Sequence, residues 1–186
     1  MLILDNRNIP GVLTRIILIS LLIPTMGCRS NKSSPKTYPE AFKYLSVTKL
    51  QDKATKHPHK LKLGDWQRIL TAEQFGVTRL NQTERRNSSP YNKIDQKGIF
   101  HCVSCGNPLF DFKAKYNSGT GWPSFFQPIG KDAVATDTDY NLGVARTEVH
   151  CARCGAHLGH VFNDGPQPTG LRYCMNGVAM KFVAKP

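Results

Sequence analysis

The sequence predicts a mainly β protein with short helices before the β region, and three observations support this. Beyond Gly98 the chain consists of short alternating or aromatic runs cut by Gly, Pro, Asn and Asp, as in antiparallel strands joined by turns. Two helical patterns precede these runs, and two Cys-x-x-Cys-Gly motifs, the only internal repeat, lie among them. With 186 residues, 40% of them hydrophobic, the chain has room for one compact domain plus extensions.

Residues 1–28 have the pattern of an export signal. The apolar run 16–27 is too short to cross a bilayer and has the length of a signal-peptide core. Gly27 before Cys28 resembles a bacterial lipoprotein signal, in which the cysteine becomes the acylated first residue. The two residues before Gly27 depart from that pattern, so a plain cleaved signal and an uncleaved anchor stay open. We expect an exported lipoprotein of the bacterial periplasm or cell envelope, anchored to the membrane.

Residues 29–60 are polar, contain prolines and are strongly basic, which predicts a flexible tether. Residues 1–60 carry ten Lys and Arg against three Asp and Glu, so over half of the net charge of +12 lies there. A solvated linker is a simpler interpretation than a specific binding segment. Beside a lipidated cysteine, however, the tether would also favour an anionic membrane surface.

Residues 61–186 form the predicted domain, and it begins with two short helices. The segments LGDWQRIL and TAEQFGVTRL carry apolar residues at helical spacing. Thr71 and Gln74 fit a capping box, in which each side chain accepts a hydrogen bond from the other's backbone amide. Trp66 is interpreted as a core anchor of the first helix.

The paired cysteines predict a structural zinc site. The motifs CVSCG and CARCG each turn the backbone so that two thiolates point to one side, and the glycine permits a positive φ. Two such knuckles make a tetrahedral four-cysteine site for one zinc ion, formed by Cys102, Cys105, Cys151 and Cys154. Disulfides are the alternative that an exported protein permits, but a Cys-x-x-Cys disulfide is more often redox-active than structural.

Cys174 remains without a cysteine partner. A lone cysteine is more often an inert buried residue than a nucleophile. In a strand, however, Arg172 and Asn176 would share its face, and an adjacent cation would stabilise its thiolate. His157 and His160 are either additional metal ligands or solvent-facing residues, or else proton donors near the thiolate, and their spacing does not decide between these interpretations.

Several motifs in order resemble the methionine-R-sulfoxide reductase B family. They are TER at 83–85, CVSCGNPLF at 102–110, NSGTGWPSFF at 117–126, RTEVHCARCGAHLGHVFNDGP at 146–166 and GLRYCMNG at 170–177. The resemblance covers about 61–182 and is very specific. It implies two antiparallel β-sheets rolled toward a barrel, short N-terminal helices and a structural zinc on the four paired cysteines.

The resemblance also implies an enzyme that repairs oxidised proteins by reducing the R epimer of methionine sulfoxide to methionine. Cys174 matches the family's nucleophile, Trp122 matches the aromatic residue that packs on the substrate methyl group, and Asp164 matches a supporting acid. The matching polar active-site residues are His157, His160, Arg172 and Asn176. Thiolate attack on the electrophilic sulfur, with a proton from either histidine, would leave Cys174 as a sulfenic acid.

One departure concerns the reductant. Many family members have, where Thr120 stands here, a cysteine that resolves the sulfenic acid as a disulfide. Using a zinc cysteine instead would dismantle the knuckle, and Cys28 is blocked if acylated and at low effective concentration otherwise. We therefore expect a thioredoxin-like protein or another external thiol to reduce Cys174 directly. A smaller departure is Gly177, where serine is common, which loosens the adjacent backbone.

Two rival functions are weighed against reductase activity. A zinc-ribbon-like binding module could use basic and aromatic residues on nucleic acid. Against it, the charge excess is largely in the tether and export removes the protein from nucleic acid, so no nucleic acid partner is expected. A degenerate member that binds oxidised protein without turnover is the second rival, and the intact polar set around Cys174 argues against it. We expect a monomer.

Overall fold

The computed structural model describes residues 47–141 and 143–186, so the predicted export signal and Cys28 lie outside the described residues. The helices are α1 (Val47–Lys56), α2 (Leu63–Ile69) and α3 (Ala72–Leu80), and the short 3-10 turns are Pro58–Lys60, Pro90–Lys93, Phe112–Ala114 and Gly177–Ala179. The strands are β1 (Gly98–Cys102), β2 (Pro108–Asp111), β3 (Lys115–Tyr116), β4 (Ser124–Phe125), β5 (Val134–Asp139), β6 (Arg146–Cys151), β7 (His157–Phe162), β8 (Arg172–Met175) and β9 (Met180–Ala184).

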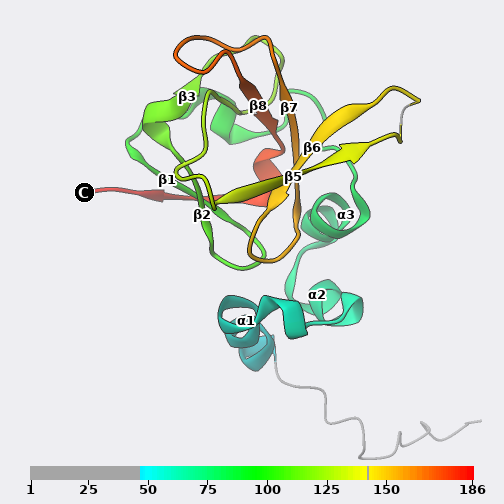
Figure 1. Cartoon of the computed structure of the whole chain (residues 1–186). Coiled ribbons are helices and arrows are strands. Elements are labelled where there is room, and N and C mark those ends of the chain that lie inside the picture. The colour runs from blue at the N-terminus through cyan, green and yellow to red at the C-terminus, as the bar shows by residue number, and fades with distance from the viewer. Residues whose placement is uncertain (1–46, 142) are drawn as a thin grey trace, which may run out of the picture. The chain divides into compact units, whose positions relative to one another are not determined.

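The strands form two antiparallel sheets, as predicted. The smaller sheet has the order β2-β1-β9, and the larger has the order β3-β4-β8-β7-β6-β5 (Figure 1). Among the described strands no ladder joins the two sheets, so the predicted barrel is not closed. Strand β8 is central in the larger sheet, which places Cys174 between β4 and β7.

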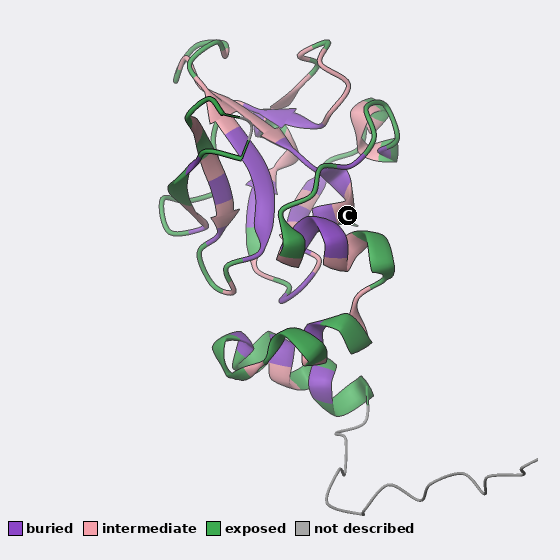
Figure 2. Ribbon diagram, turned by 90° about the vertical axis from the view of Figure 1, so that its right-hand side faces the viewer, coloured by how far each residue is buried: buried purple, intermediate pink, exposed green. Residues whose placement is uncertain are grey.

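The core lies between the two sheets and is rich in aromatic side chains. Phe110 of the smaller sheet stacks on Phe125 of the larger one with ring centroids 4.4 Å apart, and Phe100 meets Phe125 edge-on at 5.0 Å. All three rings are fully buried, and Figure 2 shows buried segments along the strands. Such aromatic pairs stabilise a core beyond the area that they bury, so they fix the two sheets against each other.

The two predicted helices are α2 and α3, and the capping box is present. Gln74 N–H donates to Thr71 Oγ1 at 3.2 Å, and Thr71 N–H donates to Gln74 Oε1 at 3.0 Å. Trp66 is buried, and the guanidinium of Arg79 lies 3.9 Å from the centre of its ring. The ring of Trp66 therefore joins α2 to α3 through a cation–π contact.

The predicted tether is wrong over its last part. Helix α1 and the turn Pro58–Lys60 occupy 47–60, and Leu50 and Ala54 of α1 are buried. These two residues are four apart and so form one narrow apolar stripe on an otherwise polar helix. The strongly basic composition of the segment outweighed this stripe in the sequence prediction. The rest of the predicted tether, 29–46, lies outside the described residues.

Candidate metal centre and active site

Two matching turns build the cysteine cluster. In the first turn, Gly106 N–H donates to the carbonyl of Cys102 at 2.8 Å, and in the second, Gly155 N–H donates to the carbonyl of Cys151 at 2.9 Å. Gly106 and Gly155 have φ values of 74° and 67°, which residues with a side chain rarely adopt. The two Cys-x-x-Cys-Gly motifs therefore fold into the same turn, as their spacing predicts.

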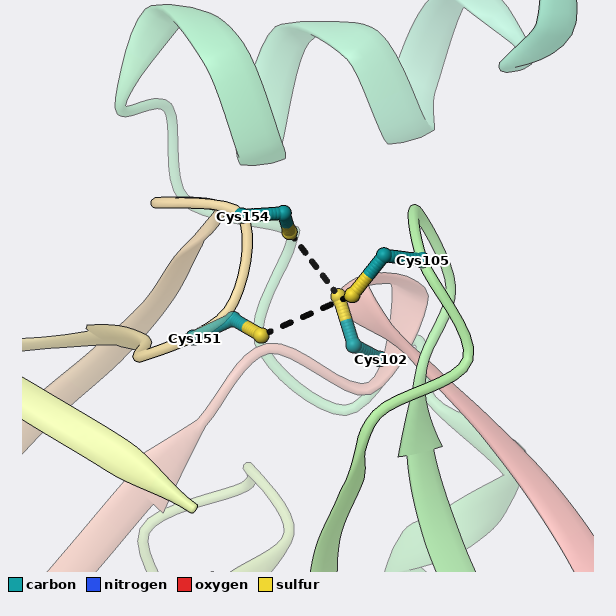
Figure 3. Close-up of side chains that lie close together, drawn as sticks. All are labelled: Cys102, Cys105, Cys151 and Cys154. Carbon is teal, nitrogen blue, oxygen red and sulfur yellow. Dashed lines mark hydrogen bonds between the residues drawn. The ribbon is translucent and has the colours of Figure 1, made fainter. Parts of the chain in front are cut away.

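The four sulfurs converge between these turns (Figure 3). Cys102 Sγ lies 3.7 Å from Cys154 Sγ, Cys105 Sγ lies 3.7 Å from Cys151 Sγ, and all four sulfurs lie within 4.8 Å of one another. A disulfide needs sulfurs about 2 Å apart, so these cysteines are free thiols. Four sulfur ligands gathered in a largely buried position form a site that can hold a metal ion.

Arg79 of α3 contacts the same cluster. Its guanidinium donates to the carbonyl of Cys154 at 2.9 Å and lies 3.6 Å from the Cys154 sulfur. Hydrogen bonds from the other three thiols, together with the charge of Arg79, hold the pKa of Cys154 below its ordinary value. A site with four thiolates carries excess negative charge even around a divalent cation, and Arg79 offsets part of that charge.

A second site surrounds Cys174 on the outer face of the larger sheet. Cys174 pairs with Ser124 on β4 and with His160 on β7, and His160 pairs with Glu148 on β6. Directly paired residues project from the same face of a sheet, so these side chains form one row across four strands. A cavity of about 140 Å³ opens above the row and is lined by Thr83, Trp122, Arg146, Gly159, His160, Phe162, Cys174 and Asn176.

A β-bulge in β7 brings His157 to this face as well. Val149 pairs with Gly159 but the next residue, His150, pairs with His157, so Leu158 is an extra residue in β7. Two residues three positions apart point to opposite faces of a regular strand, but the extra residue of the bulge turns both histidines to the same face. The rings of His157 and His160 consequently lie 5.5 Å apart.

Gly159 in the same bulge permits close packing of β7 against β8. A Cβ atom at this position would lie 2.2 Å from the carbonyl oxygen of Cys174. No side chain fits in that space, so the close approach of β7 to the backbone of Cys174 on β8 requires a glycine at this position.

His160 is oriented by a charged pair. Its Nε2 lies 2.8 Å from Asp139 Oδ2, and Arg146 donates to the same oxygen at 2.6 Å. Hydrogen bonds from the Asn141 amide, His160 and Arg146 lower the pKa of Asp139 to about 2. Burial lowers the pKa of His160 below its ordinary value, although Asp139 opposes this shift. At neutral pH Asp139 is therefore a carboxylate, and it accepts a hydrogen bond from the Nε2–H group of a largely neutral His160.

His157 has a carboxylate partner of its own. Its Nδ1 lies 2.5 Å from Glu148 Oε1, a short contact of the charge-assisted kind. The other ring nitrogen, Nε2, is buried and has no hydrogen-bond partner within the described part of the chain. His157 is buried and does not line the cavity, and its ring is the neighbour of the His160 ring.

Glu84 holds together three segments around the cavity. Its carboxylate accepts hydrogen bonds from the amides of Gly177 at 2.9 Å and Val178 at 2.8 Å. Its own amide donates to Asn176 Oδ1 at 2.9 Å, and its carbonyl accepts a bond from Trp122 Nε1 at 3.2 Å. Burial raises the pKa of Glu84, and the two backbone hydrogen bonds partly oppose this rise.

Arg172 and Asp164 lie beside the cavity rather than in its wall. The guanidinium of Arg172 forms two hydrogen bonds of 2.8 Å with the carboxylate of Asp164 and lies 4.3 Å from the centre of the Phe162 ring. Phe162 lines the cavity, whereas the Asp164 side chain is 62% exposed. Asp164 therefore fixes the position of Arg172, and Arg172 supports an aromatic wall of the cavity.

Comparison with known proteins identifies the group to which this arrangement belongs. The model of the SelR domain matches residues 70–184. A peptide methionine sulfoxide reductase MsrB of Pseudomonas fluorescens (strain Pf0-1) is 53% identical over 123 residues, which cover 66% of this chain and 94% of the relative. The enzyme of the same name from Pseudomonas aeruginosa (strain UCBPP-PA14) is also 53% identical, over 66% of this chain and 93% of that protein.

The chain belongs to the methionine-R-sulfoxide reductase B family. The family match begins within the segment between α2 and α3, so α1 and α2 both precede it. Thr120, which stands where many members of the family have a second cysteine, places Oγ1 3.7 Å from Cys174 Sγ. The hydroxyl thus occupies the space next to the sulfur in this member of the family.

The site residues that the family resemblance implies fall into two groups in the structure, according to whether they line the cavity. Cys174, His160, Asn176 and Trp122 line the cavity, whereas His157, Arg172 and Asp164 contact it through other side chains. Both amide atoms of Asn176 are bonded to backbone, because its Nδ2 donates to the carbonyl of Leu158 at 3.1 Å. Asn176 therefore shapes the wall and is held by Glu84 and Leu158.

Sequence reasoning missed Glu84, Asp139, Arg146 and Glu148 as members of the site. Glu84 stands within the TER motif and Arg146 and Glu148 within RTEVHC, so their positions in recognised motifs were the only available signal. Asp139 lies in the run AVATDTDY, where two aspartates alternate with two threonines, and nothing local distinguishes it from Asp137.

Proposed function

We propose that this protein reduces the R epimer of methionine sulfoxide in proteins to methionine, with Cys174 as the nucleophile. The observation that carries the assignment is the position of Cys174: its sulfur lines a small cavity that also holds His160 and the ring of Trp122. The other cysteines in the described part of the chain are gathered in the metal cluster. Family membership agrees with the same activity.

The residues of the cavity fit the chemistry of a sulfoxide. The Cys174 thiolate attacks the electrophilic sulfur, while the sulfoxide oxygen takes a proton. As the protonated oxygen passes to Cys174, the S–O bond to the methionine sulfur and the bond newly formed between the two sulfurs both break, so methionine leaves and Cys174 becomes a sulfenic acid. The sulfur of methionine sulfoxide is reduced by two electrons, and the sulfur of Cys174 is oxidised by two.

His160 is the better placed of the two proton donors. It lines the cavity, and the contact with Asp139 engages Nε2, which leaves Nδ1 as the ring nitrogen available to the substrate oxygen. His157, paired with Glu148, is absent from the lining of the cavity, and its ring lies 5.5 Å from that of His160. With Nε2–H directed at Asp139, Nδ1 carries a proton to donate only when the ring is in its imidazolium form, and the lowered pKa of His160 makes that form the scarcer one at neutral pH but the stronger acid.

Trp122 provides the apolar wall against which the methyl group of the substrate packs. Its indole N–H is engaged by the carbonyl of Glu84, so the orientation of the ring is fixed. A fixed apolar wall on one side and His160 on the other would place the methyl group and the oxygen separately, which is what selection of one sulfoxide epimer requires.

The sulfenic acid is reduced by an external thiol or a thioredoxin-like protein. Two thiol equivalents return Cys174 to the thiol, with release of one water and formation of one disulfide on the reductant. Within the described residues, the group next to the Cys174 sulfur at the position of a resolving cysteine is the hydroxyl of Thr120. The four paired cysteines are committed to the metal cluster.

Zinc is the metal proposed for the cluster. Four thiolates about 2.3 Å from a tetrahedral zinc ion lie about 3.8 Å from one another. The two sulfur pairs that lie 3.7 Å apart agree with this edge, and an all-sulfur set is the donor set that structural zinc prefers. Bound there, the ion would join the β1–β2 turn to the β6–β7 turn.

Export and lipidation at Cys28 are proposed from the sequence of residues 1–28, with a basic segment between the lipid and the domain that favours an anionic membrane surface. Among the residues described by the structure, no helix combines the length and apolar character needed to span a bilayer. We propose that the protein acts as a monomer on oxidised proteins of the cell envelope.

Turnover with separated sulfoxide epimers tests the function. The purified protein, with dithiothreitol as reductant, should reduce the R epimer of a methionine sulfoxide peptide and leave the S epimer unchanged. Cys174→Ser should lower the rate by at least about 10³-fold because the nucleophile is lost, while its metal content stays the same. Full activity of Cys174→Ser would refute the nucleophile, and binding of the oxidised peptide without turnover by the unmodified protein would identify a binding module.

A further inference from the structure

A chain of hydroxyl groups leads from the Cys174 sulfur to a backbone carbonyl. Thr120 Oγ1 lies 3.7 Å from the sulfur, and Ser118 Oγ lies 2.8 Å from Thr120 Oγ1 and 2.7 Å from Ser124 Oγ. Ser124 Oγ in turn donates to the carbonyl oxygen of Trp122 at 3.2 Å. Four successive contacts therefore join the nucleophile to the backbone of the residue that forms the apolar wall.

The loop that carries Thr120 is held in place by backbone contacts. Arg86 donates through Nε to the carbonyl of Thr120 at 2.8 Å, and Asn92 donates to the carbonyl of Gly121 at 2.9 Å. At the other end of the chain, Ser124 is paired in register with Cys174 across β4 and β8. The hydroxyls keep their positions relative to the sulfur, so only their hydrogens need to move.

The direction in which these hydroxyls donate their hydrogen bonds depends on the charge of Cys174, because the charge sets the number of hydrogens in the chain. A thiol and three hydroxyls supply four hydrogens for the four contacts, so every contact is made when each group donates toward the Trp122 carbonyl. A thiolate leaves three hydrogens for four contacts. A charged acceptor binds a hydrogen more strongly than a neutral carbonyl, so the unmade contact is the 3.2 Å bond from Ser124 to Trp122.

We propose that Thr120 is a positioning residue for the nucleophile, whose hydroxyl accepts from the Cys174 thiol and donates to the Cys174 thiolate as the Ser118–Ser124 chain reverses direction. The hydroxyl of Thr120, which stands where many relatives have a second cysteine, thus stabilises the Cys174 thiolate, the form that attacks the substrate. This inference rests on the proposed function, because it assigns Thr120 to the sulfur that attacks the sulfoxide.

Other groups also act on the charge of Cys174. Arg172 and Tyr116 lie within electrostatic reach of the sulfur, and His160 and Arg146 line the same cavity. Substitutions at Thr120 leave all four groups in place. Comparing a variant without the hydroxyl with one that keeps it therefore isolates the contribution of the hydrogen bond.

The pH dependence of Cys174 alkylation tests the role of Thr120. The full metal-loaded protein is treated with iodoacetamide from pH 5 to 10, and the modified peptide that contains Cys174 is quantified by mass spectrometry. Thr120→Val keeps the side-chain shape without the hydroxyl and should move the half-maximal rate upward by about one pH unit, which lowers alkylation about tenfold at pH values well below that midpoint. Thr120→Ser keeps a hydroxyl and should stay within about twofold of the unmodified protein.

Ser118→Ala distinguishes a reversing chain from simple packing. Without Ser118, Thr120 can donate to the thiolate with no bond broken at Trp122, so alkylation at pH 7 should be equal or faster. An equal profile for Thr120→Val, or a Ser118→Ala profile shifted upward as far as that of Thr120→Val, would overturn the inference. Because alkylation needs no sulfoxide, this result is independent of the turnover test on Cys174→Ser.

Discussion

The four-cysteine cluster and the Cys174 cavity place the same kind of side chain in different surroundings. In the cluster, three of the four cysteines are buried, and each sulfur lies within 4.8 Å of the other three. Cys174 is only partly buried, and its neighbours are a hydroxyl, a histidine and an aromatic ring. This difference agrees with the proposed roles, since the groups around a cysteine, more than the sulfur itself, decide whether it holds a metal or reacts with a substrate.

The two regions are nevertheless connected through one hairpin. Strands β6 and β7 meet at the turn that carries Cys151 and Cys154, and the same strands carry Glu148, His157 and His160 (Figure 1). A metal ion that fixes the turn also fixes the start of β7, where the bulge places His157 on the active face. The rigid region therefore supports the geometry of the reactive one.

The largest effect is expected from Cys154→Ser, which breaks the metal cluster. Three thiolates remain, the metal is lost, and folding loses the stabilisation that binding supplies, so the midpoint of thermal unfolding should fall by more than about 10 °C. Circular dichroism and metal content measure both changes. Cys174→Ser is the matched control and should keep the metal and the midpoint. A Cys154→Ser protein that kept both would show that the cluster does not stabilise the fold.

Glu84→Ala should have an intermediate effect on stability. It leaves the buried amide of Gly177 and the partly buried amide of Val178 without these acceptors, which should cost about 2–4 kcal/mol in the free energy of unfolding by urea. Glu84→Gln keeps one acceptor oxygen and buries no charge, so its loss should be smaller. Asp95→Asn, at an exposed position, is the control and should change stability by less than about 0.5 kcal/mol. A Glu84→Ala protein as stable as the control would contradict the role of this carboxylate.

The smallest effect concerns the pH dependence given by Asp139. Its pKa is lowered from 3.8 to about 2 in the folded protein, so it contributes stability above about pH 4 that is lost as the pH falls toward 2. The stability difference between the unmodified protein and Asp139→Asn should therefore shrink over that range in urea titrations. Asp137→Asn, on the same strand but exposed, should show no such trend. A difference that stayed constant with pH would contradict the lowered pKa.

Local patterns in the sequence predicted several elements correctly, because neighbouring residues determine them. The capping box of Thr71 and Gln74 and the turns at Gly106 and Gly155 each depend on residues within five positions of one another. Helix α1 was missed because its apolar stripe is narrow and becomes recognisable only when Leu50 and Ala54 are seen to be buried. The closure of the predicted barrel likewise depended on which strands pair, which no local pattern specifies.

The sequence by itself determined the family, the two sheets and the two kinds of cysteine, since these follow from motif spacing and from residue type. Only the tertiary structure decided which groups act together. Glu84 and Asn176 are 92 positions apart, and Thr120 and Cys174 are 54 apart, yet both pairs are in contact. Such contacts depend on strand register and on the bulge in β7, which set distances that linear spacing does not contain.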